Sequence, residues 1–275
     1  MNVRVIGIGD NVCDKYYPSM IMYPGGQAMN FSVYAKMLGA DASYMGVFGT
    51  DEVAKHVIST LDELQVDHSG CRQYEGENGY AKVRLVDGDR QFIMSNKGGI
   101  VNEHPLVLDE KDLDYIKGFQ LVHSSNNGHF DACLAKVKET GVKISYDFSY
   151  RWNEEYYYKA VVPYVDYAFF SGGDADEEVI RAVCQRMVSL GCRLVVATRG
   201  KAGSLIYNGE TFYAQPSYPV DAIDTLGAGD SFATAFLLSL LEGKDIIEAG
   251  DAGAIFASKT CMLNGAFGHG IAFSE

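Results

Sequence analysis

The sequence predicts an α/β protein in which helices cover both faces of a mostly parallel central sheet. Short β-branched runs alternate with longer helical patterns along most of the 275 residues, and this alternation is typical of parallel strands joined by crossover helices. Polar residues follow four of the β-branched runs, where strands should end: Asp10, Asp147, Ser171 and Thr198. Since ligands bind beyond the carboxyl ends of parallel strands, we expect a functional site at that edge.

The ranges of the strands and helices follow from hydrophobic period and from stop signals. The strands of the expected sheet are residues 3–8, 42–49, 119–124, 143–148, 167–171 and 193–198. One helix ends at Leu38, a second covers 51–66 and is capped by Thr50 or Asp51, and others cover 131–140 and 174–190. A hairpin over 204–206 and 211–214 precedes two further helices, 229–241 and 245–262. No linker or repeat divides the chain, so residues 1–275 are expected to form one domain.

A small β lid is expected beside the central sheet. Residues 80–86 and 90–94 alternate in polarity around Asp87-Gly88-Asp89, and Asp-Gly between alternating runs is a strong hairpin signal. This hairpin, at about 78–98, and one further strand within about 11–24 would form the lid. Closure of such a lid would exclude water from a site beneath it. Arg90 either points into that site or lies in solvent on the hairpin.

Composition and charge exclude several classes of protein. The net charge of −13 argues against nucleic acid or an anionic membrane as the main partner. No apolar run reaches about 18 residues, so no transmembrane helix is predicted, and the first residues lack the pattern of a signal peptide. A cytoplasmic protein is therefore expected. The six cysteines and six histidines have no spacing typical of zinc ligands, and His123 is interpreted as a core or edge histidine.

A glycine-rich segment near the C-terminus carries the strongest indication of chemistry. It reads Asp-Thr-Leu-Gly-Ala-Gly-Asp-Ser-Phe over residues 224–232 and opens a helical run. Unpaired amides at a helix N-terminus bind anions, and glycines allow a phosphate to approach the backbone. Asp230 lies within this anion site, where a carboxylate is electrostatically unfavourable and therefore suggests a functional role. The hypothesis is that it takes a proton from a hydroxyl during phosphoryl transfer. The alternative is a common Gly-rich helix start.

The same segment resembles the C-terminal signature of the PfkB, or ribokinase-like, carbohydrate kinases. Asp14 and the Gly-Gly-x-x-x-Asn element at 25–30 resemble the N-terminal signature of that family, although singly they are typical of turns and loops. The resemblance covers essentially the whole chain. It implies a three-layer αβα ribokinase-like fold with a small β lid. It also implies an enzyme that depends on ATP and Mg²⁺ and binds a sugar or an amino sugar.

The resemblance assigns roles to residues in both signatures. Asp230 is the implied catalytic base. The implied anion hole consists of three successive backbone amides, those of Gly227, Ala228 and Gly229. The implied sugar ligands are Asp14, Gly26 and Asn30 of the N-terminal signature. Asp10 is a further candidate sugar ligand because it lies at the carboxyl end of the first strand. Carboxylate and amide groups suit sugar binding, because each hydroxyl both donates and accepts hydrogen bonds.

The resemblance also implies where the nucleotide binds. The segment 198–203 matches the nucleotide-binding Thr-x-Gly-x-x-Gly pattern with three residues, Thr198, Gly200 and Gly203. Ala254 and Ser258 would line the adenine slot by analogy, although small residues on a helix also serve packing. Asp147 and Arg151 lie in a segment similar to one in fructokinase-like members, where the Asp helps to hold the metal and the Arg meets phosphate.

Two further acidic residues are candidate metal ligands. Many family members have Asn-x-x-Glu after a central strand, whereas this chain has Ser-Gly-Gly-Asp at 171–174. Asp174 therefore either replaces the acidic ligand or caps the next helix. Asp224 resembles a position near a monovalent-cation site in ribokinases, which adds such a cation to the expected cofactors.

The resemblance narrows the range of expected acceptor substrates. Segments 9–14 and 147–152 most resemble those of fructoselysine 6-kinases, which phosphorylate an amino sugar made from lysine and glucose. A fructokinase, ribokinase or nucleoside kinase of the same family is the first alternative, and a sugar sensor that has lost catalysis is the second. A nicotinamide oxidoreductase is disfavoured, because no Gly-x-Gly-x-x-Gly follows the first strand. A homodimer through the lid is expected by analogy with the family.

Overall fold

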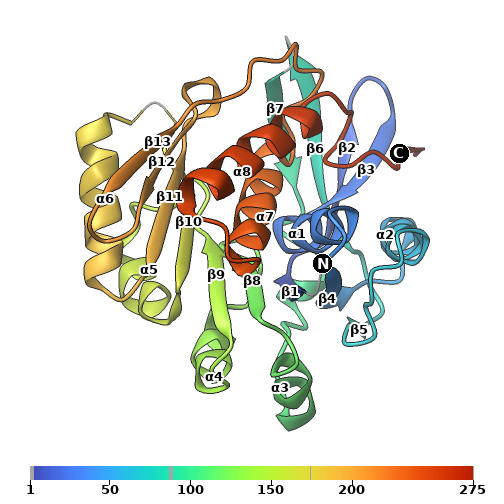
Figure 1. The fold of residues 1–275 in the computed structure, drawn as a ribbon. Helices are drawn as coiled ribbons and strands as arrows, with labels where there is room; N and C mark the ends of the chain where they lie inside the picture. Colours follow the sequence, from blue (N-terminus) through green and yellow to red (C-terminus); the bar gives the residue numbers. More distant parts are fainter. Residues whose placement is uncertain (1–2, 87–88, 174, 275) are drawn as a thin grey trace.

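Nine strands form the central sheet of the computed structural model, which describes residues 3–86, 89–173 and 175–274 (Figure 1). Their order across the sheet is β13-β12-β11-β10-β9-β8-β1-β4-β5. All neighbours from β5 to β11 pair in parallel, whereas β12 and β13 add an antiparallel edge. The bounds are β1 Arg4–Gly9, β4 Asp41–Phe48, β5 Arg72–Gln73, β8 Leu121–Ser125, β9 Lys143–Asp147, β10 Tyr167–Ser171, β11 Leu194–Thr198, β12 Ser204–Tyr207 and β13 Phe212–Gln215.

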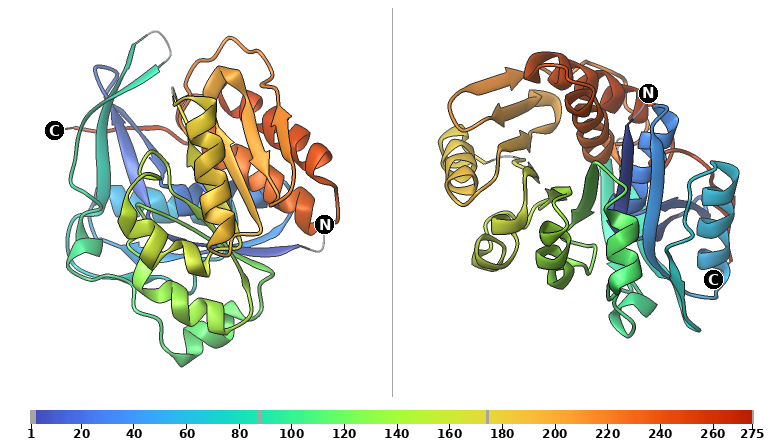
Figure 2. Two further views of the ribbon diagram at one scale, coloured as in Figure 1. Left: turned by 90° about the vertical axis from the view of Figure 1, so that its left-hand side faces the viewer. Right: turned by 60° about the horizontal axis from the view of Figure 1, so that its bottom comes forward.

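Helices cover both faces of the central sheet (Figures 1 and 2). One face packs against α1 Gln27–Met37, α7 Ala228–Leu241 and α8 Ile246–Thr260. The other face packs against α3 Glu110–Ile116, α4 Leu134–Glu139, α5 Glu155–Ala160 and α6 Glu177–Ser189. Each layer has its own apolar core, with Phe31 and Phe236 in the first and Leu134 and Ile180 in the second. The three-layer αβα fold that the sequence predicts is therefore confirmed.

Strand β1 illustrates why the strands appear as apolar runs in the sequence. Successive side chains of a strand point to opposite faces. Val5 accordingly packs in the core beneath α1 and α7, whereas Ile6 and Ile8 pack in the core of the opposite layer. All three side chains are fully buried, and each contributes about 1.5–3 kcal/mol by leaving water. A parallel sheet covered on both faces requires this continuous apolar pattern.

A second sheet of five strands, in the order β14-β3-β2-β6-β7, follows directly from the end of β1 (Figure 1). Its bounds are β2 Val12–Tyr16, β3 Ile21–Gly25, β6 Gly79–Val86, β7 Asp89–Ser95 and β14 Ile271–Ala272. The predicted hairpin of β6 and β7 is present, and its tip at 87–88 lies outside the described residues. The sequence predicts one strand within 11–24, whereas the structure has two, joined by a turn. Helix α2 Glu52–Glu63 packs on this sheet, where Val57 joins Cys13 and Met22 in one core.

Several short elements differ from the predicted ranges. The helix predicted at 131–140 begins as a 3₁₀ turn at 131–133 before α4, and the helix predicted from 174 begins at Glu177. Helices α3 and α5 and strand β5 are absent from the prediction, because elements of two to seven residues show too little periodicity. None of the described helices is long and apolar enough to cross a membrane.

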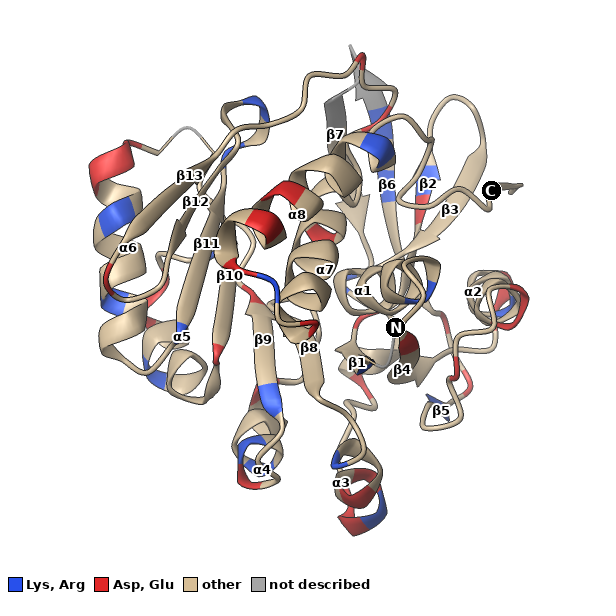
Figure 3. Ribbon diagram, in the orientation of Figure 1, with Lys and Arg blue, Asp and Glu red and all other residues tan. Residues whose placement is uncertain are grey.

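Charged residues are distributed unevenly among the helices (Figure 3). Helix α6 carries acidic and basic residues along its length, as expected of a helix with one face in solvent. Helix α7 contains a single charged residue, Asp230, which lies in its first turn and is buried. A buried carboxylate in an otherwise uncharged helix is unfavourable without compensation. Its surroundings therefore define the candidate site.

Candidate active site

The carboxyl ends of β1, β8 and β9 bring polar side chains together, as the parallel order predicts. The two carboxylate oxygens of Asp10 accept the amides of Gln27 and Ala28 at 2.9 and 3.1 Å, and Ser125 Oγ donates to Asp10 at 3.4 Å. Asp10 therefore holds the first turn of α1 in place. Its hydrogen bonds support this structural role, and the direct sugar contact expected from the sequence stays a prediction.

Asp147 lies beside Asp10 at the end of β9. Its Oδ1 accepts the amide of Ser149 at 2.7 Å, and the side chain of Gln27 also hydrogen-bonds to it. Burial, together with the charge of the neighbouring Asp10, raises the pKa of Asp147 to about 6. Among the residues that the structure describes, no Lys or Arg offsets the charge of either carboxylate. This donor set, with a carboxylate and uncompensated negative charge, fits Mg²⁺.

The start of α7 places Asp230 against α1. Gly227 is the N-cap, with a φ of 75° that favours glycine, and Ala228, Gly229 and Asp230 form the first turn. Asn30 Nδ2 donates to Asp230 Oδ2 at 2.6 Å. A Cβ added at Gly229 would meet no atom within 4 Å, so this turn opens into free space. The amides of the first turn and the carboxylate of Asp230 therefore lie at one end of α7.

Asp14 and Asn30 lie together next to Gly25. A Cβ built at Gly25 would lie 3.3 Å from Asp14 Oδ2 and 3.6 Å from Asn30 Oδ1. Asn30 is buried, and its Oδ1 has no hydrogen-bond partner in the structure. Gly26 has a φ of 110°, and a Cβ there would lie 2.7 Å from the carbonyl oxygen of Asp10. The structure thus brings the predicted sugar ligands Asp14, Gly26 and Asn30 to the same place as Asp230.

The segment 198–203 follows β11 at the same edge of the sheet. Thr198 ends the strand, and its Oγ1 donates to the carbonyl of Phe170 at 3.4 Å. Gly200 and Gly203 have φ values of 55° and 83°. A Cβ at Gly203 would collide with the backbone at Gln215, whereas one at Gly200 would meet no atom within 4 Å. Gly203 is therefore required by packing, and Gly200 leaves open space beside the backbone.

Four other predicted residues have different surroundings from those expected. Arg151 donates to both carboxylate oxygens of Glu154, at 2.7 and 2.8 Å, so its guanidinium is already paired. Ala254 is buried in the core beneath α8, and Ser258 Oγ donates to the carbonyl of Ile255 within the same helix. Asp224 is fully buried and accepts three hydrogen bonds from protein donors. Packing explains Ala254, and internal pairing explains Arg151 and Asp224.

Some predicted positions lie outside the described part of the chain. Asp174 belongs to this group, and so do the side chains of residues 85–90, including Arg90. His123, by contrast, is fully buried, stacks on Phe31 at 4.5 Å and pairs through Nδ1 with Ser145 Oγ at 3.0 Å. Burial lowers the pKa of His123 to about 3, so it is the neutral core histidine expected from the sequence.

Two polar connections at the site were not predicted. Asn127 Nδ2 donates to Gln27 Oε1 at 2.9 Å, which links the loop after β8 to α1 and, through Gln27, to Asp147. Asn78 Nδ2 donates to Asn11 Oδ1 at 2.8 Å, which links β6 to the end of β1. The signal for Asn127 was available, because it follows a predicted strand end in the same way as Asp147 does. Nothing in the local sequence marks the pairing of Asn78 with Asn11.

Comparison with known proteins agrees with this fold and shows the family. The family profile described as "pfkB family carbohydrate kinase" matches residues 1–267. A fructosamine kinase, FrlD, of Bacillus subtilis is 42% identical over 269 residues, which cover 98% of this chain and 94% of that protein. A fructoselysine 6-kinase of Escherichia coli is 30% identical over 260 residues, which cover 94% of this chain and 98% of that protein.

Solved structures show the same fold at low sequence identity. An Arabidopsis thaliana ribokinase complexed with ribose and ATP superposes with a TM-score of 0.79 at 20% identity, covering 97% of this chain and 95% of that one. A candidate ribokinase II of Escherichia coli, in complex with ATP and Mg²⁺, gives the same TM-score and identity over 96% of this chain and 94% of that one. Fold and sequence agree, and the chain belongs to the PfkB family of carbohydrate kinases.

Proposed function

We propose that this sugar kinase transfers the γ-phosphoryl group of ATP to the 6-hydroxyl of fructoselysine. The observation that carries the proposal is the 42% identity, over 98% of the chain, to a fructosamine kinase. The 30% identity to a fructoselysine 6-kinase adds to it. Both names denote kinases of sugars joined to an amine. The acceptor expected from segments 9–14 and 147–152 is of the same kind.

Asp230 is the proposed general base. A sugar held by Asp14 and Asn30 would present its hydroxyl next to the Asp230 carboxylate, which Asn30 holds through a 2.6 Å hydrogen bond. The unpartnered Asn30 Oδ1 is suited to accept a hydrogen bond from the sugar. As the hydroxyl oxygen forms its bond to the γ-phosphorus, its proton passes to Asp230, and the bond to ADP breaks. The proposed anion hole, the amides of residues 227–229, stabilises the charge on the transferred group.

ATP is proposed to bind along segment 198–203, where Gly200 leaves open space beside the backbone. Thr198 ends β11, two residues before Gly200. Asp147 is the proposed ligand of Mg²⁺, because its buried charge lacks a compensating cation. When bound, Mg²⁺ would neutralise part of the negative charge on the phosphates. Relatives of the same fold have been solved with ATP and with Mg²⁺.

The second sheet is proposed to act as a lid over the sugar, within a single domain of residues 1–275. Asp14 lies on β2, so the strand that would hold the sugar belongs to the lid itself. The edge strand β7 exposes Phe92, Ile93 and Met94 to solvent. Such an apolar edge suits the homodimer through the lid that is expected by analogy with the family. Sedimentation of the purified protein would distinguish a dimer from a monomer.

The function is tested by release of ADP from Mg-ATP in the presence of a panel of acceptors. The panel contains fructoselysine, related glucose–amino acid adducts, fructose, ribose and adenosine. Asp230→Asn is the matched control, because it keeps the shape of the side chain and removes its basicity. Phosphorylation of fructoselysine on its 6-hydroxyl, in preference to the other acceptors, is the expected outcome.

Three other outcomes would change the proposal. Preference for a plain sugar or a nucleoside would replace the acceptor and keep the chemistry of Asp230. ATP binding without turnover of any acceptor would favour a sugar sensor. Turnover that survives in Asp230→Asn would assign the activity to a different site or a contaminating enzyme.

A further inference from the structure

Asp224 lies where three segments that are far apart in the sequence meet. Its side chain is fully buried. Tyr16 of β2 donates its hydroxyl to Oδ2 at 2.6 Å, and the amide of Gly265 donates to the same oxygen at 2.9 Å. The amide of Leu226 donates to Oδ1 at 3.0 Å. Donors from three segments therefore surround one buried carboxylate.

These donors do not suit the monovalent cation that the sequence places near Asp224. A hard cation is held by oxygen atoms turned toward one centre, whereas here one O–H and two N–H groups point at the carboxylate. Hydrogen bonds to a charged acceptor are stronger than neutral ones and offset the burial of the charge. The residues present fit an internally satisfied carboxylate and do not fit a cation ligand.

One donor connects Asp224 to the proposed lid. Tyr16 is buried and lies on β2, two residues after Asp14. Residues two apart on a strand share a face of the sheet, so a movement that carries Asp14 toward a sugar also moves Tyr16. The ring of Tyr23, on the adjacent strand β3, packs edge-on against Tyr16 with a centroid distance of 5.1 Å.

The other two donors connect Asp224 to the turn that opens α7. Leu226 directly precedes Gly227, the N-cap of α7. Gly265 directly precedes Ala266, whose carbonyl accepts the hydroxyl of Tyr34 at 2.6 Å. A Cβ at Gly227 would collide with Tyr34 Oη, so this hydroxyl lies against the turn. Asp224 therefore sets the backbone position of the residues that supply the proposed anion hole.

We propose that Asp224 is a positioning residue that couples the sugar lid to the anion hole through Tyr16. This inference rests on the proposed function of Asp230 and of the amides of residues 227–229. The hydrogen bond from Tyr16 to Asp224 ties β2, which carries Asp14, to the turn at 224–227, so a sugar that holds β2 in place also favours the geometry of the turn that binds the phosphoryl group. The same hydrogen bond holds this turn without a monovalent cation.

Coupling is measured by the binding of a non-hydrolysable ATP analogue with Mg²⁺, in the presence and absence of the sugar that the wild type phosphorylates. Coupled sites change each other's affinity by about fivefold or more, so the sugar is expected to tighten analogue binding by that factor. Tyr16→Phe is expected to reduce the tightening to less than about twofold. Tyr23→Phe is the matched control, because it removes from the adjacent ring a hydroxyl that makes no hydrogen bond to the described residues. This variant should retain the tightening.

Equal tightening in the wild type and Tyr16→Phe, or none in the wild type, would overturn the coupling. If Tyr16→Phe does not fold, Asp224→Asn replaces it. This variant is expected to lower kcat by about tenfold while the KM for the sugar changes less than about threefold. A protein that phosphorylates no sugar would refute the proposed function and the coupling together, whereas active protein without coupling refutes this inference alone.

A separate experiment tests whether binding of the ATP analogue depends on a monovalent cation. Binding of the ATP analogue is compared in potassium, sodium and tetramethylammonium chloride at equal ionic strength. Affinities within about twofold of one another are expected, because protein donors already satisfy Asp224. Binding that is tenfold tighter in potassium would overturn it, and this comparison needs no acceptor.

Discussion

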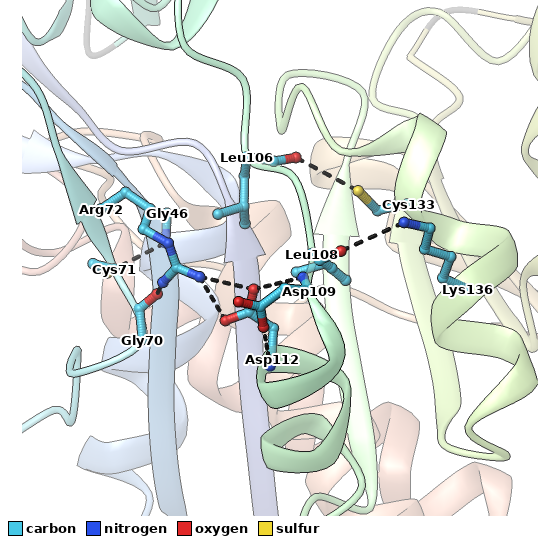
Figure 4. Close-up of polar contacts among 10 residues, drawn as sticks. All are labelled: Gly46, Gly70, Cys71, Arg72, Leu106, Leu108, Asp109, Asp112, Cys133 and Lys136. Atoms are coloured by element: carbon cyan, nitrogen blue, oxygen red, sulfur yellow. Dashed lines mark hydrogen bonds and ion pairs between the residues drawn. The ribbon is translucent and has the colours of Figure 1, made fainter.

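Two clusters of carboxylates in this molecule differ in how their charge is compensated. At the start of α3, Arg72 donates to both carboxylate oxygens of Asp112, at 2.6 and 2.7 Å (Figure 4). Asp109 and Asp112 also accept each other's backbone amides as a capping box. The hydrogen bond from the Asp112 amide lowers the pKa of Asp109. Each carboxylate in this cluster therefore has a cation or a helix N-terminus beside it, and the cluster joins β5 to α3.

The carboxyl edge of the sheet has the opposite arrangement. Asp10 and Asp147 are close together, and burial raises the pKa of both. Asp230 is also buried, and Asn30 Nδ2 donates a hydrogen bond to it. The negative charge of Asp10 and Asp147, which no described Lys or Arg offsets, favours a cationic ligand. The comparison indicates that compensated carboxylates here build structure, whereas uncompensated carboxylates mark the proposed site of catalysis.

The largest effect is expected from Asp230→Asn, which removes the proposed base. Turnover should fall by about a hundredfold to ten-thousandfold, because general bases typically contribute that much. ATP binding should stay within about threefold of the wild type, since the amides of the first turn are unchanged. Steady-state ADP release and calorimetric ATP titration measure the two quantities. Near-normal turnover would show that Asp230 is not the base.

Asp147→Asn tests how much the uncompensated charge of Asp147 lowers the stability of the folded protein. The pKa of Asp147 is raised from 3.8 to about 6 in the folded protein. Ionisation therefore destabilises the folded state as the pH rises through this range, and no such cost exists below about pH 4. The variant should be more stable than the wild type by up to about 3 kcal/mol at pH 7 and no more stable at pH 4.

Urea denaturation at several pH values, without Mg²⁺ or nucleotide, measures that difference. Added Mg-ATP should stabilise the wild type more than Asp147→Asn, because the metal would compensate the carboxylate. A gain in stability that does not depend on pH would argue against an ionised, uncompensated Asp147.

Gly229→Ala distinguishes an effect on ligand binding from an effect on folding stability. Gly229 has open space at its Cβ position, whereas a Cβ at Gly227 would collide with Tyr34 and would require a φ of 75°. Alanine at 229 should keep the stability or raise it by up to about 1 kcal/mol, because alanine favours helix. It should lower kcat/KM by about tenfold or more, because the methyl group would occupy the space of the phosphoryl group. Gly227→Ala is the control, and it should lower the stability as well as the activity.

The smallest effect on activity is expected from a change in the compensated cluster at the start of α3. Arg72→Ala leaves Asp112 without its cation, and the free energy of unfolding should fall by about 1–2 kcal/mol, given that Arg72 is partly exposed. Because no atom of this cluster belongs to the proposed site, kcat/KM should stay within about twofold. Urea denaturation and ADP release measure both. A loss of activity at unchanged stability would contradict the division between the two clusters.

The sequence alone predicted the features that depend on neighbouring residues. The apolar run at 3–8 predicted a strand buried on both faces, and the structure confirms it. Asp51 was one of two predicted helix caps, and its side chain accepts the amide of Ala54 at 2.9 Å. The glycine-rich segment at 224–232 predicted a helix start that exposes amides, because the spacing of glycines and the following apolar run are local. Helices as short as α3 and α5 lacked the length that periodicity needs.

The tertiary structure decided which charged residues are compensated. Arg151 was predicted to meet phosphate, yet it is paired with Glu154. Asp224 was predicted to lie near a cation, yet it accepts a hydrogen bond from Tyr16, which is 208 positions away in the chain. Compensation of a buried charge depends on donors within about 3 Å, and such distances are set by the packing of distant segments. The residue types and the edge of the sheet could therefore be predicted, whereas the role of each carboxylate could not.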